Sequence, residues 1–170
     1  DALAQIENIT ADNARLVSNL HANLGGLYRM NGYPDLAREH MEKSISLLDQ
    51  FNLLHINDSI PQIANYAMFL TEQQEPERGI SELQKLSGII KEYHSDEYLD
   101  YAKVQETLGT IYLMTANLSH AKTHFKKAFK IYEKIWADEP EMIEAKYREI
   151  QELYPQIGFS IGKTLSGLLT

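Results

Sequence analysis

At 170 residues the chain has the length of one ordinary domain, and its 24 acidic and 16 basic residues give a formal net charge of −8, which argues against nucleic acid and anionic lipid as partners. It contains no cysteine, which excludes disulfides and cysteine-ligated metal sites and fits a reducing compartment. No apolar run approaches the roughly 20 residues of a membrane span, and residues 1–9 lack the blocks of a secretion signal, so we expect a cytoplasmic chain with no membrane partner.

All the elements that the sequence predicts are helices, and no strand pattern competes with them. Breaks in the helical pattern fall at residues 31–34 (Asn-Gly-Tyr-Pro), 74–76 (Gln-Glu-Pro) and 115–117 (Thr-Ala-Asn). Residues 58–61 and 138–140 combine an acidic residue with an early proline, which is a helix-start signal. In chain order, the sequence predicts helices over 12–31, 34–51, 60–73, 76–93, 98–115, 118–136 and 140–153.

The chain repeats its pattern every 42 residues. Gly25 and Gly109 lie 84 residues apart in the same motif, Leu-Gly-x-x-Tyr, and Ala67 stands midway between them. Fixed periods of this length indicate stacked supersecondary units. Small residues at these places allow two antiparallel helices to approach closely, and large residues fill the volume around them. The second helices supply the matching small residues Ala37, Gly79 and Ala121, and the predicted filling residues are Tyr28, Tyr112, Met41, Leu83 and Phe125.

This register predicts one all-α domain over residues 1–170, an α-α superhelix of about three helical hairpins with partial units at its ends. Ala2 and Ile6 precede Ser44 and Leu48 by 42 residues, so the start resembles the tail of a truncated hairpin. The last segment is either a degenerate fourth hairpin or a capping helix, and both ends suggest a piece of a longer protein. The predicted units are 1–9 (tail), 12–51, 58–93 and 98–136 (repeats 1 to 3) and 140–170 (final unit).

The segment from Leu108 to Ala128 resembles the tetratricopeptide repeat in full. The copy from Leu24 to Ser44 departs from that pattern only at Ser44, whereas the copy from Tyr66 to Leu86 lacks the motif's tyrosine and its turn glycine. The usual period of the family is about 34 residues, and 42 is similar to the longer variant in kinesin light chains and many bacterial regulators. The resemblance implies a solenoid that binds a protein or peptide partner and catalyses no reaction.

In such arrays the first helix of each hairpin lines the concave face. Asn23 and Asn65 lie 42 residues apart and so occupy equivalent places on successive hairpins. Their amides could pair with the N–H and C=O groups of an extended peptide, although solvated amides, or amides bonded to neighbouring helices, remain the alternative. The predicted peptide-binding face comprises Asn19, Asn23, Arg29, Asn65, Met68, Lys103, Thr107 and Thr110.

The sequence gives little support to a chaperone-tail clamp, a metal site or a catalytic site. The clamp by which family members grip chaperone tails has five places here, and only Asn65 and Lys103 match it, so we do not expect that ligand. His120 and His124 have the spacing of two zinc ligands, but no third ligand is obvious and the glutamate of a zinc peptidase is missing. No nucleophile with a base and no phosphate loop is present. We therefore expect no enzymatic activity, no metal and no cofactor.

Two functions remain after these exclusions. The first is a scaffold that binds a protein or peptide and forms part of a larger protein. The alternative is a peptide-sensing regulatory domain of a bacterial transcription or signalling protein, in which binding shifts the stacking of the hairpins. Self-association through the solenoid ends also stays open, because truncated ends expose apolar surface.

Overall fold

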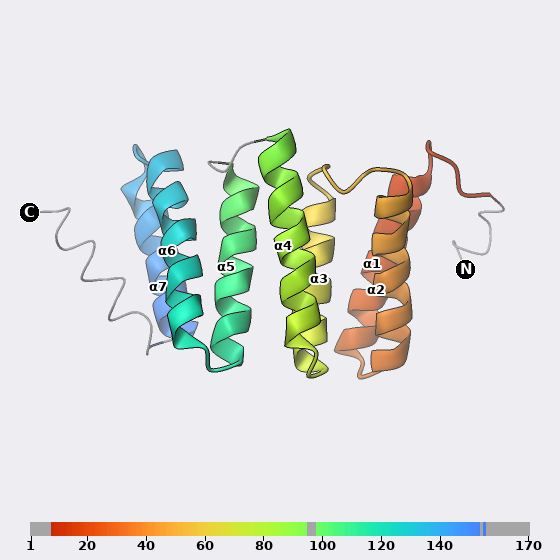
Figure 1. The fold of residues 1–170 in the computed structure, drawn as a ribbon, viewed down its shortest axis with the longest axis horizontal. Helices are drawn as coiled ribbons and strands as arrows, with labels where there is room; N and C mark the ends of the chain where they lie inside the picture. Colours follow the sequence, from red (N-terminus) through yellow and green to blue (C-terminus); the bar gives the residue numbers. More distant parts are fainter. Residues whose placement is uncertain (1–7, 95–97, 154, 156–170) are drawn as a thin grey trace, which may run out of the picture. The chain divides into compact units, whose positions relative to one another are not determined.

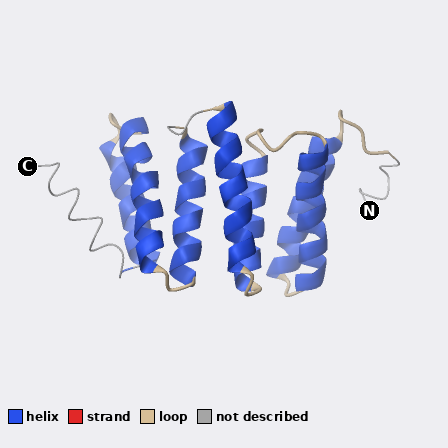
Figure 2. Cartoon of the chain, in the orientation of Figure 1, coloured by secondary structure: helices blue, strands red, loops and turns tan. Residues whose placement is uncertain are grey.

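The computed structural model describes residues 8–94, 98–153 and 155, and within them every regular element is a helix (Figure 2). Each observed helix begins and ends within two residues of its predicted bounds. Residues 1–7 of the predicted tail and nearly all of the last segment beyond 153 lie outside the described residues. The helices are α1 (Ala14–Met30), α2 (Pro34–Gln50), α3 (Ser59–Glu72), α4 (Pro76–Tyr93), α5 (Leu99–Met114), α6 (Leu118–Ile135) and α7 (Pro140–Leu153).

The chain divides into two compact units, residues 1–95 and residues 96–170. In the first unit α1 packs against α2 and α3 packs against α4, which gives two helical hairpins (Figure 1). In the second unit α5 pairs with α6 to form the third hairpin, and α7 also contacts α6. Whether the two units act as one domain over residues 1–170 stays a prediction.

Each hairpin closes at the small residues that the repeat pattern marked. A Cβ atom on Gly25 would lie 2.6 Å from Cγ of Met41, and one on Gly79 would lie 2.7 Å from the carbonyl oxygen of Ala67. In the third hairpin a Cβ on Gly109 would meet the ring of Phe125 at 3.0 Å. The first two distances would force a neighbouring atom to shift, and the third is tighter than most Cβ contacts, so the predicted close contact within each hairpin is confirmed.

The turns inside the hairpins also repeat every 42 residues. Gly32, Gln74 and Ala116 adopt the left-handed backbone conformation, with φ of 76°, 64° and 59°. The N–H that follows each of them donates to the carbonyl five residues earlier, at 2.9, 2.8 and 2.7 Å, and this bond closes the helix end. The second and third turns thus keep the geometry of the first without its glycine, and the degenerate second copy forms a complete hairpin.

In the first unit the two hairpins meet along a polar seam. Between the first helices it joins Arg15 to Asp58 and Arg29 to Glu72, each pair 43 residues apart. Between the second helices Arg78 of α4 pairs with Glu42 of α2 at 2.8 Å, and these two residues are 36 positions apart in the sequence.

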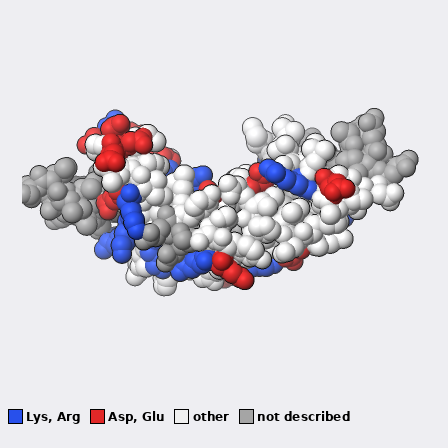
Figure 3. All heavy atoms as spheres, turned by 90° about the horizontal axis from the view of Figure 1, so that it is seen from above, with Lys and Arg blue, Asp and Glu red and all other residues white. Residues whose placement is uncertain are grey.

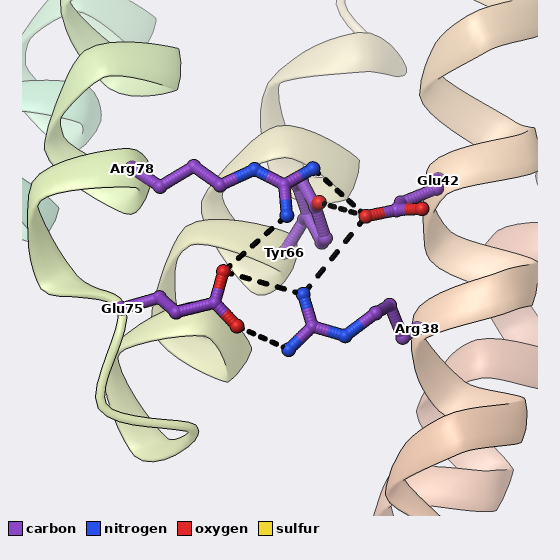
Figure 4. A network of polar contacts seen from close by, with 5 residues as sticks. All are labelled: Arg38, Glu42, Tyr66, Glu75 and Arg78. Atoms are coloured by element: carbon purple, nitrogen blue, oxygen red, sulfur yellow. Dashed lines mark hydrogen bonds and ion pairs between the residues drawn. The ribbon is translucent and has the colours of Figure 1, made fainter.

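Five side chains of this seam form the network in Figure 4. Arg38 on α2 pairs with Glu75 at 2.5 Å, and the hydroxyl of Tyr66 donates to Glu42 at 2.7 Å. Burial opposes the ionisation of Glu42, but hydrogen bonds from Tyr66 and Arg78 outweigh it and hold the pKa of that carboxyl below its usual range. The network ties α2, α3 and α4 together and so fixes how the second hairpin sits on the first.

Within the described part of the chain, no helix combines the length and the apolar character that a bilayer span requires.

We predict that Gly79→Ala lowers the free energy of unfolding by about 1–3 kcal/mol, because the new methyl group meets a backbone oxygen that cannot move cheaply. Gly88 lies in the same helix with no atom within 4 Å of its would-be Cβ. As the matched control, Gly88→Ala should raise that free energy by about 0.5–1 kcal/mol. Urea denaturation followed by circular dichroism measures both, and effects of the same sign would contradict the close approach.

Candidate peptide-binding pocket

The first unit contains a pocket of about 290 Å³ between its two first helices, α1 and α3, with α2 contributing to its lining. Its walls combine amides, a hydroxyl, a carboxylate and a few apolar side chains. The lining residues are Asn19, Ala22 and Asn23 from α1, Met41 and Ser44 from α2, Asp58 just before α3, and Pro61, Gln62 and Asn65 from α3.

A buried hydrogen-bond network supports the pocket from beneath. Ser18, Ser44 and Gln62 are all at least nine-tenths buried. The hydroxyls of Ser18 and Ser44 both donate to Oε1 of Gln62, at 2.8 and 2.5 Å. Because one residue from each of three helices takes part, the network sets the relative positions of those helices, and with them the shape of the pocket.

One wall of the pocket is a chain of hydrogen bonds. Nε2 of Gln62 donates to Oδ1 of Asn19 at 2.5 Å, and Nδ2 of Asn19 donates to Oδ2 of Asp58 at 3.3 Å. Nε of Arg15 donates to the same carboxylate oxygen at 2.6 Å. The bonds from Arg15 and Asn19 hold the pKa of Asp58 below its ordinary value. This wall is therefore ordered before any ligand arrives.

Asn23 and Asn65 differ from Asn19. Both side chains are exposed and both line the pocket. Within the described residues, neither amide has a hydrogen-bonding partner, so each keeps its full set of two donors and an acceptor. The alternative in which an asparagine bonds a neighbouring helix therefore applies to Asn19, while Asn23 and Asn65 remain available.

The other predicted residues do not line this pocket. Arg29 is engaged with Glu72 in the seam, and Met68 lies half-buried on α3. Three predicted residues belong to α5 in the second unit, where Lys103 pairs with Asp100 at 3.0 Å and the hydroxyls of Thr107 and Thr110 donate to carbonyls of their own helix.

The structure thus brings together three of the eight predicted residues, Asn19, Asn23 and Asn65. Sequence reasoning missed Gln62 and Asp58 as parts of the site. A signal was available, because Gln62 and Ser44 are polar residues at positions that a helical repeat normally fills with apolar side chains. The exact partner of Asn19 was harder to find, since it lies 43 residues ahead and the sequence period is 42.

The histidine pair of α6 stacks on a tyrosine. The rings of His120 and His124 lie 5.0 and 5.3 Å from that of Tyr112. Nδ1 of His124 lies 2.9 Å from Oε1 of Gln105, and since an amide oxygen only accepts, the imidazole is the donor. Among the described residues no group of three potential ligands could hold a metal ion. The observed contacts give this pair a packing role between α5 and α6.

The first hairpin repeats part of this arrangement 84 residues earlier. His40 stacks on Tyr28 at 5.3 Å, and its Nδ1 lies 2.8 Å from Nδ1 of His21, the counterpart of Gln105. Burial, together with His40, lowers the pKa of His21. Two facing nitrogens at this distance share one proton, so the contact requires that at least one ring be neutral.

We predict that replacing Gln62 with leucine lowers the free energy of unfolding by about 1–3 kcal/mol, because the buried hydroxyls of Ser18 and Ser44 lose their shared acceptor. Gln84→Leu, at an exposed site on α4, serves as the control and should stay within about 0.5 kcal/mol of the parent chain. Guanidinium denaturation measures both, and equal small effects would show that the network contributes nothing to stability.

We also predict that the thermal midpoint of unfolding is lower at pH 5 than at pH 7, in part because of His124. Burial lowers the pKa of His124 to about 4, and Lys127 and His120 act in the same direction. The unfolded chain binds this proton near pH 6.5, so stability that is complete above that pH is lost as the pH falls toward 4. His124→Gln should reduce the fall in the midpoint.

The exposed neighbour provides the control, since His120→Gln leaves the half-buried ring of His124 in place and removes only the smallest of the three causes that lower its pKa, so it should keep most of the pH dependence of the parent chain. His21 adds a fall that is common to all three proteins. An unchanged pH dependence in His124→Gln would contradict the assignment.

Comparison with known proteins supports the resemblance. The tetratricopeptide repeat family matches residues 59–134, which run from α3 to α6. The crystal structure of BtubC (BKLC) from P. vanneervenii shares the fold, with a TM-score of 0.66 at 18% sequence identity. The alignment covers 77% of this chain and 50% of that one, so this chain spans about half the length of BtubC. No curated protein sequence matches the chain.

These findings support the architecture. The shared fold confirms an all-α helical-repeat arrangement, and residues 59–134 match the tetratricopeptide repeat.

Proposed function

We propose that this chain is a non-catalytic scaffold that holds an extended segment of a partner protein at the pocket between α1 and α3. Tetratricopeptide repeats generally mediate protein–protein interaction, which supports the class of function. The observation that carries the specific proposal is the pair of unpartnered amides, Asn23 and Asn65, beside a pocket whose other polar groups are already bonded.

The chemistry of the pocket suits a peptide backbone with one inserted side chain. Each free amide can donate to a peptide carbonyl and accept from a peptide N–H. A volume of about 290 Å³ is at the lower end for a small-molecule site, and it accommodates a single side chain. Ala22, Met41 and Pro61 supply apolar surface to that side chain, while Ser44 and Gln62 limit how apolar it can be.

Charge contributes little to this site. Asp58 is the one ionisable residue among those lining the pocket, and it is already paired with Arg15. Much of the described surface in the view of Figure 3 is uncharged, although acidic groups gather in one cluster of it. We therefore expect binding that depends on neutral hydrogen bonds and changes little with salt concentration.

A display library of unstructured peptides, selected on the wild-type chain, provides ligands without knowledge of the natural partner. We predict that Asn23→Ala combined with Asn65→Ala weakens binding of the selected peptides about tenfold or more, since each lost hydrogen bond contributes about 0.5–1.5 kcal/mol. Fluorescence anisotropy measures the affinity at low and at high salt.

Gln84→Ala, which removes an exposed amide from α4, is the matched control and should bind like the wild type. Equal affinity of the double variant would place the peptides elsewhere on the chain. Failure to select any peptide would contradict peptide binding itself.

A further inference from the structure

Lysines gather on the solvent-facing side of α6, although the chain as a whole has a net charge of −8. The helix has 18 residues, of which five are lysines and one, Glu133, is acidic. Three or four residues make about one helical turn, so lysines at this spacing lie on one side of the helix. We call four of them the lysine patch: Lys122, which is partly exposed, and Lys126, Lys127 and Lys130, which are exposed.

No carboxylate among the described residues forms an ion pair with the lysine patch. The nearby acidic groups have other partners, since Glu106 of α5 accepts from Lys146 at 2.9 Å and Glu133 accepts from Tyr147 at 3.3 Å. Residues 154–170 contain no aspartate or glutamate, so none of their side chains can neutralise the patch. Like charges at these spacings destabilise a helix, and an unneutralised patch therefore favours an external anionic partner.

The patch is particular to the third hairpin. One and two repeats earlier, the places of Lys126 and Lys130 carry acidic or neutral residues, so the repeat architecture does not require lysine there. These equivalent residues are Glu42 and Ser46 on α2, and Gln84 and Gly88 on α4.

The exposure of Lys127 and Lys130 does not depend on a neighbouring hairpin. Their equivalents in the first hairpin are Lys43 and Ser46, and the second hairpin packs against that hairpin. Both residues remain exposed there. A further hairpin stacked on the third one in the same way would therefore leave Lys127 and Lys130 open to a partner.

We propose that the lysine patch binds an acidic segment of a partner protein. Such a segment is short enough to meet the positive charge of the patch alone. A nucleic acid or an anionic membrane would extend beyond the patch and would also face the chain's excess of acidic groups. The patch lies in the second unit and the pocket in the first, so it is a second binding surface that does not rest on the proposed pocket.

The spacing of the patch suits an extended segment. Lys122, Lys126 and Lys130 follow one another at intervals of four residues, which is about 6 Å along a helix axis. Alternate side chains of an extended chain are about 6.6 Å apart and point to the same side. Glutamates at every second position can therefore approach successive lysines.

A fluorescent peptide of alternating glutamate and serine is the probe. Anisotropy with the full chain should show saturable binding at low salt that weakens strongly as salt is added. Lys127→Gln combined with Lys130→Gln should raise the Kd about fivefold, because each exposed ion pair contributes modestly. Lys43→Gln with Lys85→Gln is the matched control. It removes two charges from the places equivalent to Lys127 on α2 and α4, and it should bind like the wild type.

Circular dichroism verifies that both variants keep their helices, as expected for exposed positions. A wild type that does not bind the peptide would overturn the proposal. So would equal weakening in the two variants, because net charge alone would then explain the attraction. Oligothymidine and phosphatidylserine vesicles test the other anionic classes, and binding of either as tight as that of the peptide would also overturn it.

Carbodiimide cross-linking locates the peptide, since it joins carboxylates to lysine amines in direct contact. Mass spectrometry should find the products mainly on the lysine patch, and an even distribution over the exposed lysines of the chain would contradict the assignment. The Asn23→Ala and Asn65→Ala double variant should bind the acidic peptide like the wild type. Failure of the patch and failure of the pocket are therefore distinguishable.

Discussion

The close approach of two antiparallel helices at a small residue is the contact on which the rest of this structure depends. At Gly79 the backbone of α4 lies against the carbonyl of Ala67, and at Gly25 and Gly109 a large side chain of the second helix lies 2.6 and 3.0 Å from where a Cβ would stand. Such contacts tolerate almost no change in volume, so they fix the distance between the helices and their rotation about their own axes. That rotation decides which side chains of each helix face the neighbouring hairpin and which face solvent.

A second constraint acts between the hairpins of the first unit, and it is polar. The buried hydroxyls of Ser18 and Ser44 must find partners, because an unsatisfied buried group costs about 1–3 kcal/mol, and Gln62 satisfies both. No buried side-chain nitrogen or oxygen among the described residues lacks a partner. Polar contacts of this kind are directional, so they select one register of the second hairpin on the first. The pocket lies beside these contacts. Asn23 and Asn65 are the amides of its lining that make no hydrogen bond with the described residues.

The two faces of the first hairpin therefore differ in the specificity that they can provide. The face toward the second hairpin is held by hydrogen bonds and ion pairs with defined partners, such as Arg38 with Glu75. Elsewhere the first hairpin exposes the apolar side chains of Leu16, Leu27 and Met30, whose contacts are non-directional and favour burial by any complementary surface. A repeat architecture permits this difference because equivalent positions share a location on the hairpin but not a side chain.

The sequence by itself determined the helices, the turns between them and the 42-residue period, because prolines, glycines and the spacing of apolar residues act locally. It also placed Asn23 and Asn65 at equivalent positions. Only the tertiary structure decided that Asn19 bonds Gln62 and that Gln74 and Ala116 adopt the turn geometry of Gly32 without being glycine. It also decided that the first helices pair at an offset of 43 residues and the second helices at 36. The physical reason is that periodicity reveals which face of a helix is buried, whereas the side chains that meet across that face depend on how neighbouring helices shift and rotate to pack.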